Sequence, residues 1–453
     1  MIQSERIKIL NENTVKKRKY VLYWMQQSQR SEYNHALEYA VETANELDKP
    51  LIVFFGLTDT FPEANERHYS FMLEGLRDVH STLAQRGIQL VIQHCSPERG
   101  VIPLSCDACV VITDRGYLRI QKMWRHYAAT HIDCPLIQVE SDVVVPVEVA
   151  SCKEEYSAAT FRPKIKKVLR HYLIPLKAQR LKHYSLTMRF QSFDVSTTAK
   201  ALRRLNIDRS VKAVQHLRGG TAAAKTKLRA FMRHTLHKFA DLRNDPSLDY
   251  LSHMSPYLHF GQISPLFIAL KVKNARGAGT NAYLEELLIR RELSMNFVYY
   301  NDQYDSFDGL PAWAQKTLRR HARDHRDYTY TRNELERAQT HDPYWNAAQN
   351  EMVYTGTMHG YMRMYWGKKI LEWSGHPEDA FRIALFLNNK YELDGRDANG
   401  FTGVAWCFGK HDRPWAERPI FGKIRYMSAD GLTRKFDMDT YVRRVERAVK
   451  KIT

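Results

Sequence analysis

The sequence predicts a two-part fold, in which an α/β domain with a parallel, doubly wound sheet precedes a large all-α domain. Short, continuously apolar runs alternate with stretches of helical periodicity over the first 150 residues. Helical periodicity dominates from residue 221 onward, where strand signals nearly vanish. The chain has 453 residues, of which 44% are hydrophobic, and this is enough for two domains with buried cores.

Five parallel strands are expected in the N-terminal part. Continuous apolar runs are typical of strands buried on both faces of a parallel sheet. These runs occupy residues 20–24, 51–57, 89–93, 108–113 and 136–140. Helical spacing between them is clearest over residues 33–47 and 69–86. No G-x-G-x-x-G follows the first run, so the dinucleotide-binding fingerprint is absent.

The same patterns divide the chain into three segments. Residues 1–150 form the α/β domain, the basic and irregular residues 151–215 connect the domains, and residues 216–453 form the helical domain. Two helices stand out in the last segment. Residues 282–300 (AYLEELLIRRELSMNFVYY) place leucines near one helical face, and residues 361–373 form the second helix.

The charge of the chain favours a polyanionic partner. Lys and Arg number 68 against 50 Asp and Glu, which gives a net charge of +18. Nucleic acid is the first candidate and an anionic membrane surface the second, while general solubility is the simplest alternative. No apolar run approaches the roughly 18 residues of a bilayer-spanning helix. The N-terminus also lacks the apolar segment of a secretory signal.

The six cysteines are sparse, which favours reduced thiols in the cytoplasm, or in the nucleus of a eukaryote. Cys106 and Cys109 form a C-x-x-C, but a zinc ribbon needs a second pair. Cys109 also begins an apolar run, so we expect a buried strand thiol and no metal site.

Three tryptophans of the helical part could pass an electron hole by hopping. Trp366 and Trp373 are seven residues apart, so on a helix they differ by about 20° in direction and about 10 Å in height. Trp345 precedes them in HDPYWNAAQ. Spacing alone favours the alternative that these are core aromatics.

A second group of residues could surround a large ligand. Arg363 lies on an apolar and aromatic helix, where a guanidinium needs an acidic partner or a bound ligand. Asp394 opens a loop and would be a suitable partner, and Asn388 ends the apolar run before it. Ser252 and Ser255 precede an apolar helix, where hydroxyls suit phosphate, although plain N-capping explains them equally well.

Several longer blocks point to one family. They are SPYLHFGQIS, THDPYWNA, TMHGYMRMYWGKKILEW, YELDGRDANG, HDRPWAERPIFGKIRYMS and RKFD, together with FMLEGL (71–76) and TFRPK (160–164) nearer the N-terminus. In sequence and order they resemble the signature blocks of the class II cyclobutane pyrimidine dimer photolyases. The likeness runs nearly end to end, which is far more specific than any single motif.

The resemblance implies a U-shaped FAD inside the helical domain. Arg363 and Asp394 would form a salt bridge beside the isoalloxazine, and Asn388 would face its N5. Ser252 and Ser255 would hold the phosphates. Two further positions of the flavin pocket would be Phe239 and Asn399.

The resemblance also implies roles in catalysis and DNA binding. Trp366, Trp345 and Trp373 would carry electrons from the surface to the flavin. Glu286 would hydrogen-bond the dimer and stabilise its radical anion. The pocket for the flipped-out lesion would be lined by Met364, Trp406 and Trp415. The family's usual antenna chromophore is a deazaflavin, and the chain is expected to act as a monomer.

Three positions depart from the family pattern. Phe239 replaces a Tyr near the flavin phosphates, and Asn389 replaces an Asp after the flavin-facing Asn388. Arg290 replaces a Trp that stacks near flavin and lesion. Because Arg290 follows Glu286 by one turn, it could pair with that carboxylate and weaken repair, or face a lesion phosphate and preserve repair. We favour the phosphate.

Light-driven repair of pyrimidine dimers in DNA is therefore the expected function. One rival is a cryptochrome-like blue-light photoreceptor, which would use the same flavin and tryptophans for signalling. No long extension follows the RKFD block, and Glu286 and Trp406 are retained, which favours repair. The other rival, a DNA-binding protein that has lost its flavin, is opposed by intact Asn388, Arg363 and Asp394.

Overall fold

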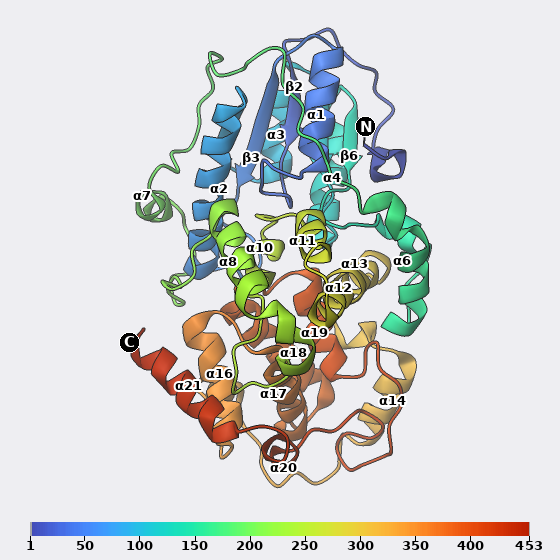
Figure 1. The fold of residues 1–453 in the computed structure, drawn as a ribbon, viewed down its shortest axis with the longest axis vertical. Helices are drawn as coiled ribbons and strands as arrows, with labels where there is room; N and C mark the ends of the chain where they lie inside the picture. Colours follow the sequence, from blue (N-terminus) through green and yellow to red (C-terminus); the bar gives the residue numbers. More distant parts are fainter. Residues whose placement is uncertain (1, 453) are drawn as a thin grey trace.

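The structure is a computed structural model that describes residues 2–452 and contains a six-stranded sheet followed by a helical region (Figure 1). The strand order is β1-β6-β5-β2-β3-β4. The strands are β1 (Ile7–Ile9), β2 (Tyr20–Trp24), β3 (Leu51–Leu57), β4 (Gln89–His94), β5 (Ala108–Asp114) and β6 (Leu136–Val139). All five predicted strands are present, and they pair in parallel.

The predicted number of strands is one too low. β1 pairs antiparallel with β6 at the sheet edge, where Ile7 opposes Val139 and Ile9 opposes Ile137. β1 consists of only three residues, IKI, none of which is fully buried. It therefore lacks the continuous apolar run that identifies the parallel strands in the sequence.

Helices cover both faces of the sheet, as a doubly wound fold requires. α1 (His35–Glu46) and α2 (Glu66–Gln85) share one apolar core with the sheet, and α3 (Pro97–Ser105) and α4 (Arg119–His131) share another. Alternate residues of β2 point into the two cores, because successive side chains of a strand face opposite sides. The predicted α/β architecture is confirmed.

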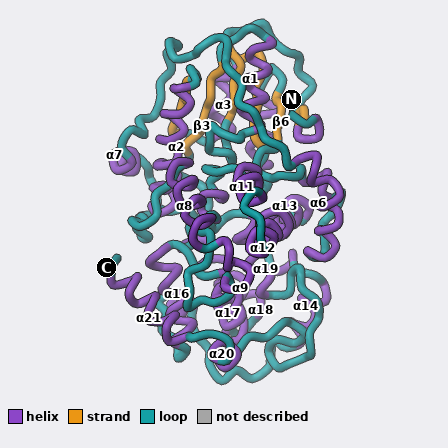
Figure 2. The backbone as a smooth tube through the Cα atoms, viewed as in Figure 1, coloured by secondary structure: helices purple, strands orange, loops and turns teal. Residues whose placement is uncertain are grey.

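The remainder of the described chain is helical, and no strand follows β6 in it (Figure 2). The longer helices are α6 (Ala158–Tyr172), α8 (Thr221–His234), α11 (Pro265–Lys273), α13 (Arg291–Tyr300), α14 (Ala312–Arg320), α16 (Pro343–Thr355), α17 (Gly360–Trp373), α18 (Pro377–Tyr391), α19 (Ala398–Cys407) and α21 (Met438–Lys450). The shorter ones are η1 (Ser4–Arg6), α5 (Val147–Ala150), α7 (Thr198–Arg203), η2 (Leu236–Lys238), α9 (Phe239–Leu242), α10 (Ser255–His259), α12 (Ala278–Leu284), η4 (Phe307–Gly309), α15 (Arg332–Glu336) and α20 (Ala429–Thr433). Among residues 2–452, no helix is both long and apolar enough to cross a bilayer.

The helix predicted over residues 282–300 is interrupted. A π-helix, η3 (Glu285–Arg290), separates α12 from α13, and within it the N–H of Arg291 donates to the carbonyl of Glu286, five residues earlier. Apolar spacing does not reveal such an insertion, because the flanking segments each keep their own helical period. Single π-turns are frequent at functional sites.

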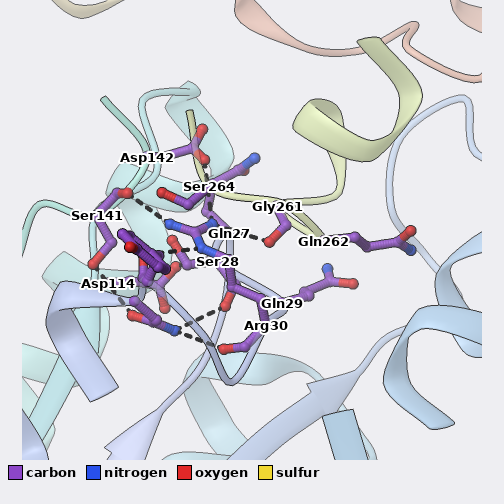
Figure 3. Close-up of polar contacts among 12 residues, drawn as sticks. Gln27, Ser28, Gln29, Arg30, Asp114, Ser141, Asp142, Gly261, Gln262 and Ser264 are labelled. Carbon is purple, nitrogen blue, oxygen red and sulfur yellow. Dashed lines mark hydrogen bonds and ion pairs between the residues drawn. The ribbon is translucent and has the colours of Figure 1, made fainter. Parts of the chain in front are cut away.

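Arg30 connects the two regions from a buried position between β2 and α1 (Figure 3). Its Nη1 donates to the carbonyl of Gly261 at 3.0 Å, and its Nη2 donates to the carbonyl of Ser141 at 2.7 Å. The Asp142 carboxylate lies 3.8 Å away. Asp114, at the end of β5, accepts backbone N–H bonds from the turn that carries Arg30. The buried guanidinium is thus matched by acceptors from both regions.

α13 makes a second set of contacts with the α/β region. Arg291 donates from Nη2 to Asp142 Oδ2 at 2.9 Å. Glu292 accepts from the backbone N–H groups of Val144 and Val145 at 2.6 and 3.2 Å. Burial raises the pKa of Glu292 to about 8, although both N–H bonds oppose that shift. The start of α13 is therefore fixed to the chain that follows β6.

Candidate functional site

The three tryptophans singled out in the sequence lie in contact and are buried. The rings of Trp366 on α17 and Trp345 on α16 stack, with centroids 6.5 Å apart and planes 7° apart. The ring of Trp373 lies 5.6 Å from Trp345 at 67°. Trp345 Nε1 donates to the carbonyl of Trp366 at 3.0 Å, and Trp366 Nε1 donates to Gln349 Oε1 at 2.8 Å. The spatial order is Trp366, Trp345, Trp373.

Trp373 does not itself reach the surface. The rings of Tyr330 and His341 lie against it, each with its centroid 5.3 Å from that of Trp373. His341 in turn stacks on the exposed ring of Tyr328 at 3.7 Å. Ring contacts therefore continue from the tryptophans to the surface through residues that sequence analysis did not identify.

Arg363 on α17 contacts two carboxylates. Its Nη2 lies 3.0 Å from Glu392 Oε1 and 3.4 Å from Asp394 Oδ1. Burial alone would lower the pKa of Arg363, but attraction to these carboxylates raises it above its ordinary value, so the guanidinium stays protonated. The expected contact with Asp394 is present, whereas the closer Glu392 was missed. The available signal for Glu392 was an acidic residue flanked by Tyr391 and Leu393, a setting that favours a buried carboxylate with a basic partner.

Asn388 lies beside this cluster, near the C-terminus of α18. A Cβ on Gly400 would come within 3.1 Å of Asn388 Nδ2 and 3.3 Å of the Asp394 carbonyl oxygen. The glycine at the start of α19 therefore lets the two segments approach. Asn399, the residue before it, is half-buried. A Cβ on Gly403, one turn later, would lie 4.0 Å from Arg363 Cδ, which places α17 at the same point.

The residues expected near flavin phosphates lie around α10 and α9. Ser255 is the first residue of α10 and is exposed, while the half-buried Ser252 accepts from the backbone N–H of Met254 at 3.4 Å. Phe239 is buried against the rings of Phe231 and Tyr283, at centroid distances of 5.6 and 5.4 Å. The serines are thus accessible, whereas Phe239 packs in the core.

A cavity of about 240 Å³ lies between α17, α19 and the chain after α19. Met364 and Trp406, both expected to contact the lesion, line it. The other lining residues are Asn244, Tyr361, Lys368, Asp412, Arg425 and Met427. Burial lowers the pKa of Lys368 to about 8. Trp415 lies outside this lining and is 41% exposed, with the guanidinium of Arg413 over its ring.

Glu286 and Arg290 both lie in η3 but do not pair with each other. Glu286 accepts a hydrogen bond from Arg243. Arg290 Nε lies 3.8 Å from Glu285 Oε1, and its guanidinium carbon lies 5.2 Å from the centroid of a Trp406 ring, within cation–π range. The structure therefore does not show the Arg290–Glu286 pair. Neither of these partners, Arg243 and Glu285, was expected from the sequence.

A second cavity lies between the sheet and the helical region. Its walls come from the turn after β2, from β3, α2 and α4, and from the start of α19. The lining is largely aromatic and apolar with a few amides and charges, and it includes Gln26, Gln29, Phe55, His68, Tyr69, Tyr117, Gln121, Trp124, Asp142 and Arg396.

Comparisons with known proteins agree with this architecture. Residues 21–182 match the family model described as DNA photolyase. The protein named deoxyribodipyrimidine photo-lyase from Methanothermobacter thermautotrophicus is 57% identical over 98% of this chain and 99% of its own length. A class III photolyase structure from Agrobacterium tumefaciens has a TM-score of 0.74 at 18% identity, covering 95% of this chain and 87% of its own. A Synechocystis cryptochrome structure has a TM-score of 0.73 at 16% identity, covering 95% and 89%.

Proposed function

Because the chain belongs to the DNA photolyase family, we propose that it repairs cyclobutane pyrimidine dimers in DNA, as a class II enzyme using FAD and light. The observation that carries the proposal is the position of Arg363 and Trp366 on α17. Residues three apart on a helix are neighbours on its surface, so the charged cluster adjoins the first of three contacting indoles. A redox heterocycle at this point would have a cation beside it and an electron path leading away.

The residues present fit FAD. Arg363 Nε is buried and has no hydrogen-bond partner among residues 2–452, so one donor of the cluster is left for a ligand acceptor. Asn388 would lie at N5, Asn399 would line the pocket, and Ser252 and Ser255 would hold the phosphates. Reduced FAD, when bound and excited by light, supplies the electron that opens the cyclobutane ring, while the protein supplies position and electrostatics.

The proposed substrate is DNA with a flipped-out dimer in the cavity lined by Met364 and Trp406. The net charge of +18 suits a phosphate backbone, and Arg425 and Lys368 concentrate positive charge at this cavity. Glu286 would form a hydrogen bond with the dimer once Arg243, which now donates to its carboxylate, moves away or leaves one carboxylate oxygen free.

The cavity between the sheet and the helical region is the proposed site of an antenna chromophore of the deazaflavin type. Its aromatic wall, with Tyr117 and Trp124, suits a planar ring system, and its amides can orient polar ring edges. A chromophore there would lie beside Arg396, which is close in sequence to Asp394 of the proposed flavin site.

One observation favours a second function, a blue-light photoreceptor without repair activity. Arg290 stands where the family pattern has a stacking Trp, and the fold does not separate the functions, because the photolyase and the cryptochrome match it almost equally well. The cavity lined by Met364 and Trp406 is the feature that supports repair.

A repair assay tests the proposal. The purified protein should show flavin absorption that denaturation releases. After reduction it should remove dimers from a dimer-containing oligonucleotide in blue light, and a sample kept dark should not. A colourless protein that cannot be reconstituted with FAD would contradict the flavin assignment. A flavin-loaded protein that is photoreduced but leaves every dimer intact would favour the photoreceptor.

A further inference from the structure

The C-terminus of α18 carries two adjacent buried asparagines whose side chains are linked. Asn388 and Asn389 are each 1% exposed. Asn388 Nδ2 donates to Asn389 Oδ1 at 3.2 Å, and Asn389 Nδ2 donates to Glu63 Oε2 at 2.6 Å. Glu63 belongs to the loop between β3 and α2, so a residue of the α/β region reaches the proposed flavin site through two amides.

These bonds fix how both amides are turned. A carboxylate can only accept, so the atom of Asn389 that meets Glu63 must be its NH₂ group. A backbone N–H can only donate, and that of Arg396 points to Asn389 Oδ1 at 2.9 Å. The orientation of Asn389 therefore follows from its partners, and the usual ambiguity between amide oxygen and nitrogen does not arise.

The orientation of Asn389 determines that of Asn388. Because Asn389 offers an oxygen, Asn388 must turn its NH₂ group toward it. Its own oxygen then points elsewhere, and no group among residues 2–452 donates to Asn388 Oδ1. The position expected at flavin N5 thus presents an acceptor to a ligand.

The loop that holds Glu63 is itself fixed against α18. Asn65, Arg67 and His68 contact the successive backbone carbonyls of residues 390–392, at 2.8, 2.6 and 3.1 Å. Glu63 has a φ of 58°, a backbone conformation that residues with a side chain rarely adopt and that the surrounding structure must enforce. The carboxylate is therefore held in place by the docked loop.

We propose that Glu63 is a positioning residue for the bound flavin, acting through Asn389 to keep Asn388 Oδ1 turned toward N5. An oxygen at this place accepts a hydrogen bond from a protonated N5 and offers nothing to an unprotonated one, so it favours the reduced, protonated flavin. The proposal rests on the proposed binding of FAD.

The test measures the midpoint potential of the bound flavin in the complete, FAD-loaded protein. Glu63→Ala removes one of the two partners that fix the Asn389 amide and leaves only the N–H of Arg396, so Asn388 can present its NH₂ group more often and the potential should become more negative. Each tenfold loss of preference for the reduced form corresponds to about 30 mV in a two-electron couple. Glu63→Gln should stay close to the unmodified protein, because its Oε1 still accepts from Asn389.

Two further variants separate orientation from general disturbance. In Asn389→Asp, the new carboxyl group shares a proton with Glu63 through one oxygen and accepts from Asn388 through the other, so adding Glu63→Ala should produce no further negative shift. Glu66→Ala is the matched control, because Glu66 starts α2 and pairs with Arg209 at 3.3 Å, with no bond to Asn389.

Three results would overturn the proposal. Equal potentials for Glu63→Ala and the unmodified protein, both with flavin bound, would remove the role of Glu63 while leaving the proposed function intact. A shift in Glu66→Ala as large as that in Glu63→Ala would assign the effect to the loop as a whole. Failure of the unmodified protein to bind FAD would overturn this proposal together with the proposed function.

Discussion

The Arg290→Trp substitution restores the family's stacking residue and so tests what Arg290 itself contributes to the binding of damaged DNA. The Arg290 side chain is 34% exposed, and its guanidinium lies over Trp406 at the lesion cavity. Its acidic neighbour, Glu285, already accepts two short bonds from Arg162, at 2.7 and 3.0 Å. Arg290, whose Nε lies 3.8 Å from Glu285 Oε1, has the weaker ion pair of the two arginines and can therefore contact a phosphate.

The magnitude follows from counterion release. One phosphate contact contributes about 0.9 to the slope of log affinity against log salt, so a fourfold rise in salt costs the unmodified protein about 3.5-fold more affinity than Arg290→Trp. The new indole can also stack on the lesion, and one base-stacking aromatic contributes about 1–3 kcal/mol. Arg290→Trp should therefore bind dimer-containing DNA more tightly at high salt and undamaged DNA more weakly.

Fluorescence anisotropy with dimer-containing and undamaged duplexes, between 50 and 200 mM salt, measures both effects. Arg290→Leu is the matched control, because it removes the charge without adding an aromatic ring; it should lower the slope and weaken binding of both DNAs, without the gain on dimer-containing DNA. Unchanged slopes in both variants would refute the phosphate contact. If Arg290→Trp instead converts an inactive protein into an active repair enzyme, the natural chain is better described as a photoreceptor.

Three other predictions concern the tryptophans and the contact between the two regions. Trp366→Phe should sharply slow photoreduction of oxidised flavin in the presence of a thiol, followed by absorption, while repair by chemically pre-reduced protein should change little; unchanged photoreduction would remove Trp366 from the proximal position. Trp406→Ala should weaken binding to dimer-containing DNA by about 1–3 kcal/mol and leave binding to undamaged duplex nearly constant, and equal losses on both DNAs would exclude it from the lesion cavity. Arg30→Ala should lower the free energy of unfolding by about 3 kcal/mol in urea titrations, because it leaves buried acceptors without a donor. The control Lys19→Ala breaks an exposed pair with Asp107 and should cost less than about 1 kcal/mol, so similar losses in both variants would contradict this account.

The sequence predicted those elements whose own residues carry a clear pattern, and it did not predict those that depend on tertiary pairing. The five parallel strands are continuous apolar runs, so their positions followed directly, whereas β1 is stabilised only by pairing with β6 and has no such pattern. Arg363 and Asp394 were expected to meet because a buried guanidinium requires an acid. Glu63 gave no signal, since it is an exposed loop residue 326 positions from Asn389 and its role depends entirely on tertiary contact.

The π-helix η3 constrains the length of its segment as well as its composition. A π-turn holds one residue more than an α-turn, so removing one residue from 285–290 would close it into a regular α-helical turn and redirect the side chains within it, Glu286 among them. Glu286 now reaches Arg243, while Glu292 reaches the backbone of Val144. A one-residue deletion would have to abandon one of these contacts. Relatives that share both contacts should therefore vary here by substitution and not by insertion or deletion.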